Sequence, residues 1–297
     1  MSRVPEPHCH LVRTATSSSG AATATDKSDA KTSTASGSES SMKPPPTRLS
    51  RAIVTPALLH SLRTHPHLPK HAWYVVTGVT LSALNRPDEI PAVFHEAVGR
   101  SAVAEADEEE QLRIVRRMRE GLVKSAAVVG LPKTINALMA LKSSTPEHLL
   151  DTTSSPSPSL RTTDLHEATA SEILLRGESF FDRVYGRVSR RVMGQMDRAG
   201  TQDLGLIIRL LYGFLLSNTR ILSAAETSFV LIAGLVPQDV NPQLKGHLKG
   251  ALNNSATVPE VRAVRDVALR LCEETGMRML GSDEPGGWGW REDVASL

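Results

Sequence analysis

The sequence predicts an all-α protein, and three observations support this prediction. Apolar residues recur at helical spacing, no run alternates with a period of two, and Pro and Gly interrupt the apolar segments. Hydrophobic residues make up 40% of the chain, whereas aromatic residues make up only 4%. A core of this composition must be built from Leu, Val, Ala, Ile and Met, which is typical of helical proteins.

The N-terminal segment, residues 1–52, is rich in Ser, Thr and Ala and contains three consecutive prolines. It cannot bury enough apolar area to fold, so we expect a disordered tail. Arg3, Arg13 and the scarcity of acids are compatible with a mitochondrial transit peptide, although the composition favours a plain tail. No apolar stretch indicates a secretory signal. We therefore expect an intracellular protein, either mitochondrial or cytoplasmic.

Residues 53–142 are predicted to form a first helical half. The segment from Ala106 to Val129 has acids early and bases late, as favoured by the helix dipole, with apolar residues at helical spacing. Further helices are expected over 72–84, from Pro87 onward, and over 134–141.

Residues 143–164, rich in Ser, Thr and Pro, are predicted to be a linker to a second helical half over 165–280. In that half, Asn241 is the expected N-cap of a helix and Asn254 its left-handed terminator. Thr257 and Glu260 form a capping box that starts the last helix. The predicted helices of this half are 173–196, 204–216, 224–235, 242–253 and one starting at 257.

The C-terminal segment, 281–297, carries Trp288 and Trp290, which we expect to anchor it to the body or to a neighbour. The most apolar run, 204–216, has the length of a buried helix and contains Arg209, so no membrane insertion is expected.

Charge and cysteine content exclude several function classes. The formal net charge is +2, so bulk electrostatics predict no nucleic-acid partner. Cys9 and Cys272 are far apart, and their spacing predicts neither a zinc site nor a redox pair, so we expect no metal and no cofactor. Cys272 flanks an apolar helical stripe, which favours a small buried hydrophobe over a reactive thiol.

Two residues could carry chemistry, Glu226 in one helix and His247 in the next. A carboxylate and an imidazole brought together by a helix turn can relay protons, and histidine titrates near neutral pH. The alternatives are structural. Glu226 would then sit in the first turn of its helix, and His247, between Lys245 and Lys249, would be a surface or hydrogen-bonded residue.

The first half weakly echoes this pattern, because Glu120 also precedes an apolar run and a Gly-Leu-Pro break. Glu120 and Lys124 are spaced for a solvated or interhelical ion pair. Arg113, Arg116, Arg117 and Arg119 give the same helix a basic face, which is usually solvated but could attract a small carboxylate.

The stretch from His247 to Val264 reads HLKGALNNSATVPEVRAV. Together with Glu226 on the preceding helix, it resembles the carboxymuconolactone decarboxylase family, which includes alkyl hydroperoxidase D-like proteins. Glu226, His247, Ala251-Leu252 and Thr257–Glu260 match the family pattern. Val240 and Gln243 stand where the family has two cysteines. Residues 119–138 resemble a degenerate first copy of the repeat.

This resemblance implies an all-helical fold that assembles as a trimer or hexamer. It also implies acid-base chemistry on a small organic acid or lactone, with Glu226 and His247 as catalytic residues. Thiol peroxidase activity is not supported, because both thiols are missing. The alternative is a non-catalytic oligomeric scaffold or binding protein descended from the family.

Overall fold

The computed structural model describes residues 52–99, 106–152, 154, 156–284 and 286–297. Within these ranges the regular secondary structure is helical apart from two short strands, which confirms the all-α prediction. The predicted tail, apart from Ala52, lies outside the described residues. Residues Ser50–Leu297 form one compact unit, and the division of this unit into two halves stays a prediction.

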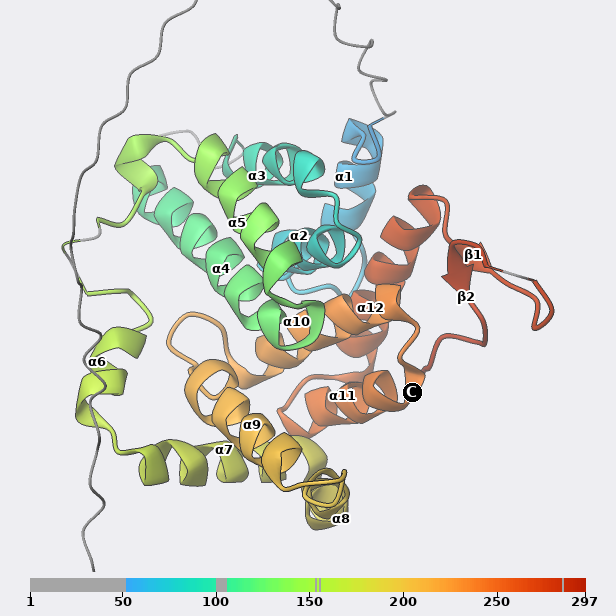
Figure 1. Ribbon diagram of the computed structural model, residues 1–297. Helices are drawn as coiled ribbons and strands as arrows, with labels where there is room; N and C mark the ends of the chain where they lie inside the picture. The colour runs from blue at the N-terminus through green and yellow to red at the C-terminus, as the bar shows by residue number, and fades with distance from the viewer. Residues whose placement is uncertain (1–51, 100–105, 153, 155, 285) are drawn as a thin grey trace, which may run out of the picture. The chain divides into compact units, whose positions relative to one another are not determined.

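The helices follow the order shown in Figure 1. Their bounds are α1 Pro56–Arg63, α2 Trp73–Ala83, α3 Ile90–Gly99, α4 Ala106–Val129, α5 Leu131–Ser144, α6 Arg161–Glu167, α7 Ala170–Tyr185, α8 Ser189–Met196, α9 Asp203–Leu210, α10 Ala224–Leu235, α11 Asn241–Asn253 and α12 Val258–Glu274. Short 3-10 turns occupy Pro87–Glu89, Glu147–Leu149, Gly186–Val188 and Val236–Gln238, and a π-helical turn spans Leu211–Leu216.

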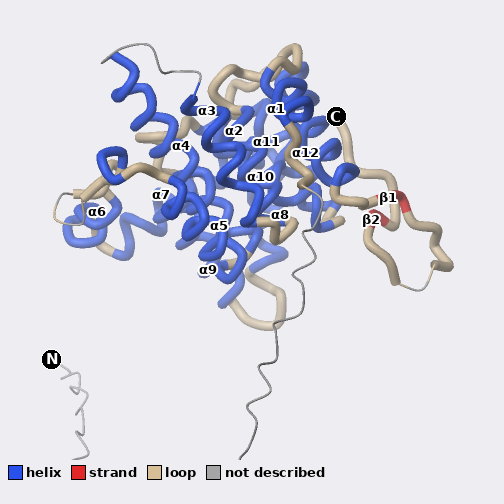
Figure 2. Tube along the Cα trace, turned by 90° about the horizontal axis from the view of Figure 1, so that it is seen from above, coloured by secondary structure: helices blue, strands red, loops and turns tan. Residues whose placement is uncertain are grey.

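Helices α2 and α10 form the centre of the main core. Every residue of α2 and nearly every residue of α10 is buried, as expected for helices that are apolar on all sides. Helix α4 packs on both of them, α12 packs on both from another direction, and α11 packs on α10. Figure 2 shows α2 and α10 in the middle of the surrounding helices.

Helices α7 and α9 build a second, smaller core around Phe180, Phe181 and Tyr212. Two glycines allow these segments to approach backbone to backbone. A Cβ on Gly177 would lie 1.9 Å from the Arg209 carbonyl oxygen, and one on Gly213 would lie 2.0 Å from that of Ile173. The predicted helix over 204–216 is thus split, since α9 gives way to the π-helical turn where Gly213 meets α7.

In the described part of the chain, three helices begin with a complete capping box, at Thr169 with Glu172, Ser223 with Glu226, and Thr257 with Glu260. The last of these confirms a prediction. The helix α11 ends at Asn253 as predicted, but its predicted N-cap and its predicted left-handed terminator are each wrong by one residue.

Val240, not Asn241, is the N-cap of α11, because Asn241 already has helical geometry and its side chain binds the C-terminal segment instead. Ser255, not Asn254, has the left-handed backbone, with φ of 75°. Asn254 is the C-cap, at φ of −95°, and its side-chain amide donates to Ser228.

The C-terminal segment packs back onto the core through one of its tryptophans. Strand β1, Arg278–Met279, pairs in parallel with β2, Gly289–Trp290. The Trp290 ring is buried, and its Nε1 donates to the Val236 carbonyl over 2.8 Å. The Arg265 guanidinium holds the carbonyls of Val294 and Ala295. Trp288 is half exposed, so Trp290 alone of the two is buried.

Candidate functional site

The most concentrated polar chemistry lies along one stripe of α4. Arg117, Glu120 and Lys124 are spaced three and four residues apart, which places their side chains in one row on the helix. All three are buried, and the row is directed toward α10 and the segment that precedes it. We call these three residues and their partners Glu226, Arg161 and Thr227 the α4 polar cluster.

At one end of the cluster, Arg117 is bonded in four directions. It forms an ion pair with Glu226, and its other N–H groups donate to the Tyr74 hydroxyl and to the carbonyls of His71 and Ile221. Its side chain is only 9% exposed. The guanidinium therefore joins α2, α10 and the segment before α10.

Glu226 has the second role of capping its own helix. Its Oε2 accepts from the Ser223 backbone N–H over 2.9 Å, and its own N–H donates to the Ser223 hydroxyl. Burial would raise the pKa of Glu226, but the hydrogen bonds from Arg117 and Ser223 lower it below its usual value. The carboxylate is therefore ionised and has both oxygens occupied. The void beside it, lined by Ala72 and Phe229 among others, has no room for a water molecule.

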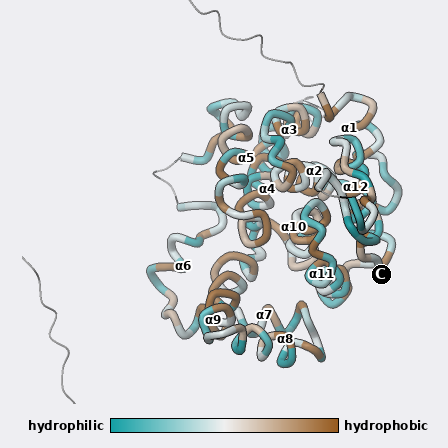
Figure 3. Tube along the Cα trace, turned by 45° about the vertical axis from the view of Figure 1, so that its right-hand side comes forward, coloured by the Kyte–Doolittle hydropathy of each residue, from teal (hydrophilic) through white to brown (hydrophobic). Residues whose placement is uncertain are grey.

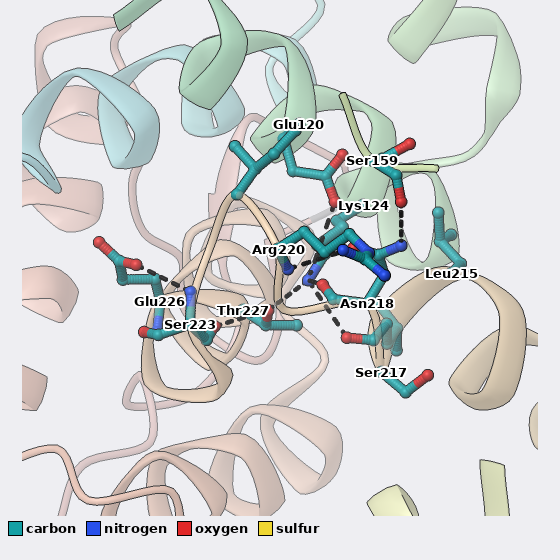
Figure 4. Close-up of polar contacts among 12 residues, drawn as sticks. Glu120, Lys124, Ser159, Leu215, Ser217, Asn218, Arg220, Ser223, Glu226 and Thr227 are labelled. Atoms are coloured by element: carbon teal, nitrogen blue, oxygen red, sulfur yellow. Dashed lines mark hydrogen bonds and ion pairs between the residues drawn. The ribbon is translucent and has the colours of Figure 1, made fainter. Parts of the chain in front are cut away.

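At the other end of the cluster, the ammonium of Lys124 is completely enclosed. It donates to the carbonyls of Leu216 and Asn218 over 3.2 and 2.6 Å and to the Thr227 hydroxyl over 2.6 Å. Figure 4 shows Lys124 directed toward Asn218 and Thr227. All three N–H directions of an ammonium are thus used. Burial lowers the pKa of Lys124 to about 8, an effect that Glu120 opposes.

Glu120 is held by Arg161 through two hydrogen bonds, and its Oε1 lies 3.9 Å from the Lys124 Nζ. The expected solvated or interhelical pair is therefore a buried pair within α4, because the π-helical turn and Arg161 cover it. Arg161 was not among the predicted residues, since it lies in the segment predicted to be a linker. The signal available in the sequence was the placement of Lys124 among apolar residues of a long helix.

His247 lies elsewhere, in α11, against the second core. Its ring is 5.9 Å from the Tyr185 ring in an edge-on arrangement, and its buried Nδ1 has no hydrogen-bond partner among the residues that the structure describes. Burial lowers the pKa of His247 to about 4, so the imidazole is neutral at physiological pH. The expected surface position is wrong, because α11 turns this residue inward between the exposed Lys245 and Lys249.

Across the described part of the chain, no hydrogen bond or ion pair connects Glu226 with His247. The first pairs with Arg117, and the second faces Tyr185. Their predicted catalytic roles stay predictions. Cys272 is fully buried, as predicted, and burial raises the pKa of its thiol well above its usual value.

The remaining arginines of α4 are also paired. Arg113 binds Glu110, and Arg116 and Arg119 share the Asp151 carboxylate. Within the described ranges, no three His, Cys, Asp or Glu side chains gather as a metal site would require. No helix in those ranges is both long and apolar enough to cross a membrane. The arrangement pairs Glu226 with Arg117 and encloses His247 beside Tyr185.

Two fungal proteins, both named Peroxisomal protein 2, are similar to this chain. The one from Schizosaccharomyces pombe is 38% identical over 216 residues, which cover 73% of this chain and 92% of the relative. The one from Saccharomyces cerevisiae is 32% identical over 266 residues, which cover 74% of this chain and 94% of the relative. No family model matches the chain, and no solved structure matches it.

Proposed function

Because the chain belongs to the family of Peroxisomal protein 2, we propose that it is a peroxisomal protein that acts by assembly and binding, not by catalysis. In this proposal, the helical pair around Glu226 and His247 is inherited from a carboxymuconolactone decarboxylase-like ancestor. The fold is retained and the residues of the former site serve packing.

The relatives correct two expectations from the sequence. Their name places the family in peroxisomes, which overturns the expected mitochondrial or cytoplasmic location. It also points away from the expected decarboxylase-like enzyme. The Ser- and Thr-rich composition of the N-terminal segment was compatible with several compartments. The two cysteines of the carboxymuconolactone decarboxylase family are absent here, so thiol redox chemistry was already not expected.

One structural observation carries the non-catalytic part of the proposal. Glu226, which would have to accept or deliver a proton, is committed to the buried Arg117 and to capping α10, next to a void too small for water. His247, the other half of the pair, is neutral and enclosed. A substrate acid would have to displace Arg117 from Glu226, and His247 is buried out of reach of solvent.

Self-association is supported by an apolar surface on α9 that the rest of the described chain leaves exposed. Leu204, Leu206, Ile207 and Leu210 are 39 to 52% exposed, and we call this surface the α9 face. Figure 3 shows α9 as a strongly hydrophobic segment. Exposed apolar patches of this kind mark interaction sites. Together with the resemblance noted in the sequence, the α9 face supports a trimer or hexamer as the assembly.

The location can be tested by imaging. Fluorescent fusions at either end of the full chain should coincide with a peroxisomal marker and not with a mitochondrial one. Mitochondrial or diffuse signal from both fusions would contradict the proposal.

The assembly can be tested with the purified full chain by size-exclusion chromatography with light scattering. The wild type should have the mass of an oligomer, and Ile207→Glu should shift it toward monomer, because a charge on the α9 face cannot be buried without a partner. Val258→Glu places the same charge on another exposed apolar residue and should leave the mass unchanged. A monomeric wild type would overturn this part of the proposal.

A further inference from the structure

A partly open apolar cavity lies between α4 and α5, away from the α4 polar cluster and from the α9 face. Its volume is about 310 Å³, at the lower end of the range for small-molecule sites. Residues Val115 and Leu141 at its base are almost fully buried, whereas Met139 at its rim is 54% exposed. The other apolar lining residues are Val123, Leu138 and Leu150.

The charges at this cavity do not balance. Arg116 and Arg119 both bind Asp151, so one carboxylate serves two guanidinium groups. Lys142 also lines the cavity, and no acidic partner holds it in the described part of the chain. Two lining cations, Arg119 and Lys142, therefore face one lining carboxylate, Asp151, which Arg116 also binds from outside the cavity, so positive charge is in excess beside the apolar space. The net positive charge at the rim complements an anionic group, and the interior complements a hydrocarbon chain.

We propose that this cavity binds an aliphatic carboxylate of medium chain length. The chain would lie against Val115, Leu138 and Leu141, and the carboxylate would meet Lys142 and Arg119 at the rim. A monoanion suits the rim better than a phosphate dianion, because Asp151 already occupies one side of Arg119 and would repel a second negative charge. This site does not depend on the proposed assembly, since none of its lining residues belongs to the α9 face.

The test is isothermal titration calorimetry on the full-length chain with decanoate, decanol and decyl phosphate. Decanoate should bind at one saturable site and more tightly than either of the others. Affinity across hexanoate, octanoate and decanoate should rise roughly fourfold per methylene while the cavity has room. Repeating the titration on Ile207→Glu separates the site from assembly, because binding should persist when the oligomer does not.

Two variants locate the site. Lys142→Glu reverses the charge of an exposed side chain and should weaken decanoate binding at least tenfold while leaving decanol unchanged. Met139→Trp fills the rim from an exposed position and should weaken the binding of both decanoate and decanol. Lys249→Glu, the same charge reversal on an exposed lysine of α11, should change neither. Thermal unfolding of each variant reports whether it is folded. If Met139→Trp does not fold, Lys142→Glu, which alters only an exposed side chain, decides whether decanoate binds in this cavity.

Several results would overturn the proposal. These are absence of saturable decanoate binding, equal affinity for decanol, tighter binding of decyl phosphate, and decanoate binding unaffected by Lys142→Glu. A change of oligomer mass in Met139→Trp without any decanoate binding to the wild type would assign the cavity to a contact between copies instead.

Discussion

At the scale of the residue, this protein is distinguished by charged side chains that it buries in pairs. Burying a charge without a partner is costly, whereas a buried pair satisfied by hydrogen bonds is tolerated. Arg117 with Glu226 and Arg161 with Glu120 meet this condition, and Lys124 meets it with two carbonyls and a hydroxyl. Removing one member of such a set should therefore lower the free energy of unfolding by more than the interaction itself contributed, because the other member is left buried without a partner.

The three capping boxes provide a matched test at Glu226. Glu226→Ala and Glu260→Ala each remove the N3 carboxylate of a capping box, but only Glu226 also neutralises a buried guanidinium. Glu226→Ala should lose roughly 3 kcal/mol more unfolding free energy than Glu260→Ala. Urea denaturation of both variants measures the difference, and equal losses would mean that Arg117 does not need its partner.

His247 should make stability depend on pH. Its pKa is about 4 in the folded chain and about 6.5 in the unfolded chain. The unfolded state therefore binds a proton first as the pH falls, and the stability present above pH 6.5 is lost toward pH 4. Between pH 7 and pH 5 this loss should be about 2 kcal/mol. His247→Phe should abolish it in urea titrations at the two pH values, and an unchanged pH dependence would contradict the assignment.

At the scale of the element, the sequence patterns predicted most helices well. The predicted bounds of the helices at 106–129 and 224–235 agree with α4 and α10, and the helix predicted over 242–253 differs from α11 by one residue at its start. Apolar periodicity and capping are local properties, and therefore they can be read from the sequence. The segment 204–216 was predicted less well, because the π-helical turn arises where Gly213 meets α7, a contact 36 or more residues away in the chain.

The close approach of α7 to α9 depends on its glycines. Gly177→Ala would place a methyl group against the Arg209 carbonyl, so α9 must move or the backbone must distort. We expect a loss of roughly 1–3 kcal/mol in unfolding free energy. Gly99→Ala in α3 is the control, because its added Cβ would have nothing within 4 Å, and it should be neutral or slightly stabilising. Thermal or urea unfolding measures the stabilities of the two variants, and equal stabilities would show that α7 and α9 do not approach each other closely at Gly177.

At the scale of the whole molecule, assembly and stability should be coupled. If copies associate through the α9 face, subunit binding stabilises the folded state by mass action. The midpoint of thermal unfolding of the wild type should then rise with protein concentration, whereas that of Ile207→Glu should not. Val258→Glu should behave like the wild type. Scanning calorimetry over a hundredfold concentration range provides the measurement, and a constant midpoint for the wild type would contradict the coupling.

By itself, the sequence determined the helical class, the position of most helices, the capping box at Thr257 and the burial of Cys272. These follow from composition and short-range spacing, which act within a few residues. Only the tertiary structure decided that Glu226 pairs with Arg117, that Lys124 is enclosed, and that His247 is buried away from Glu226. The partners in these contacts come from helices about a hundred residues apart or from a predicted linker, and only the packing of α4 against α10 brings them together.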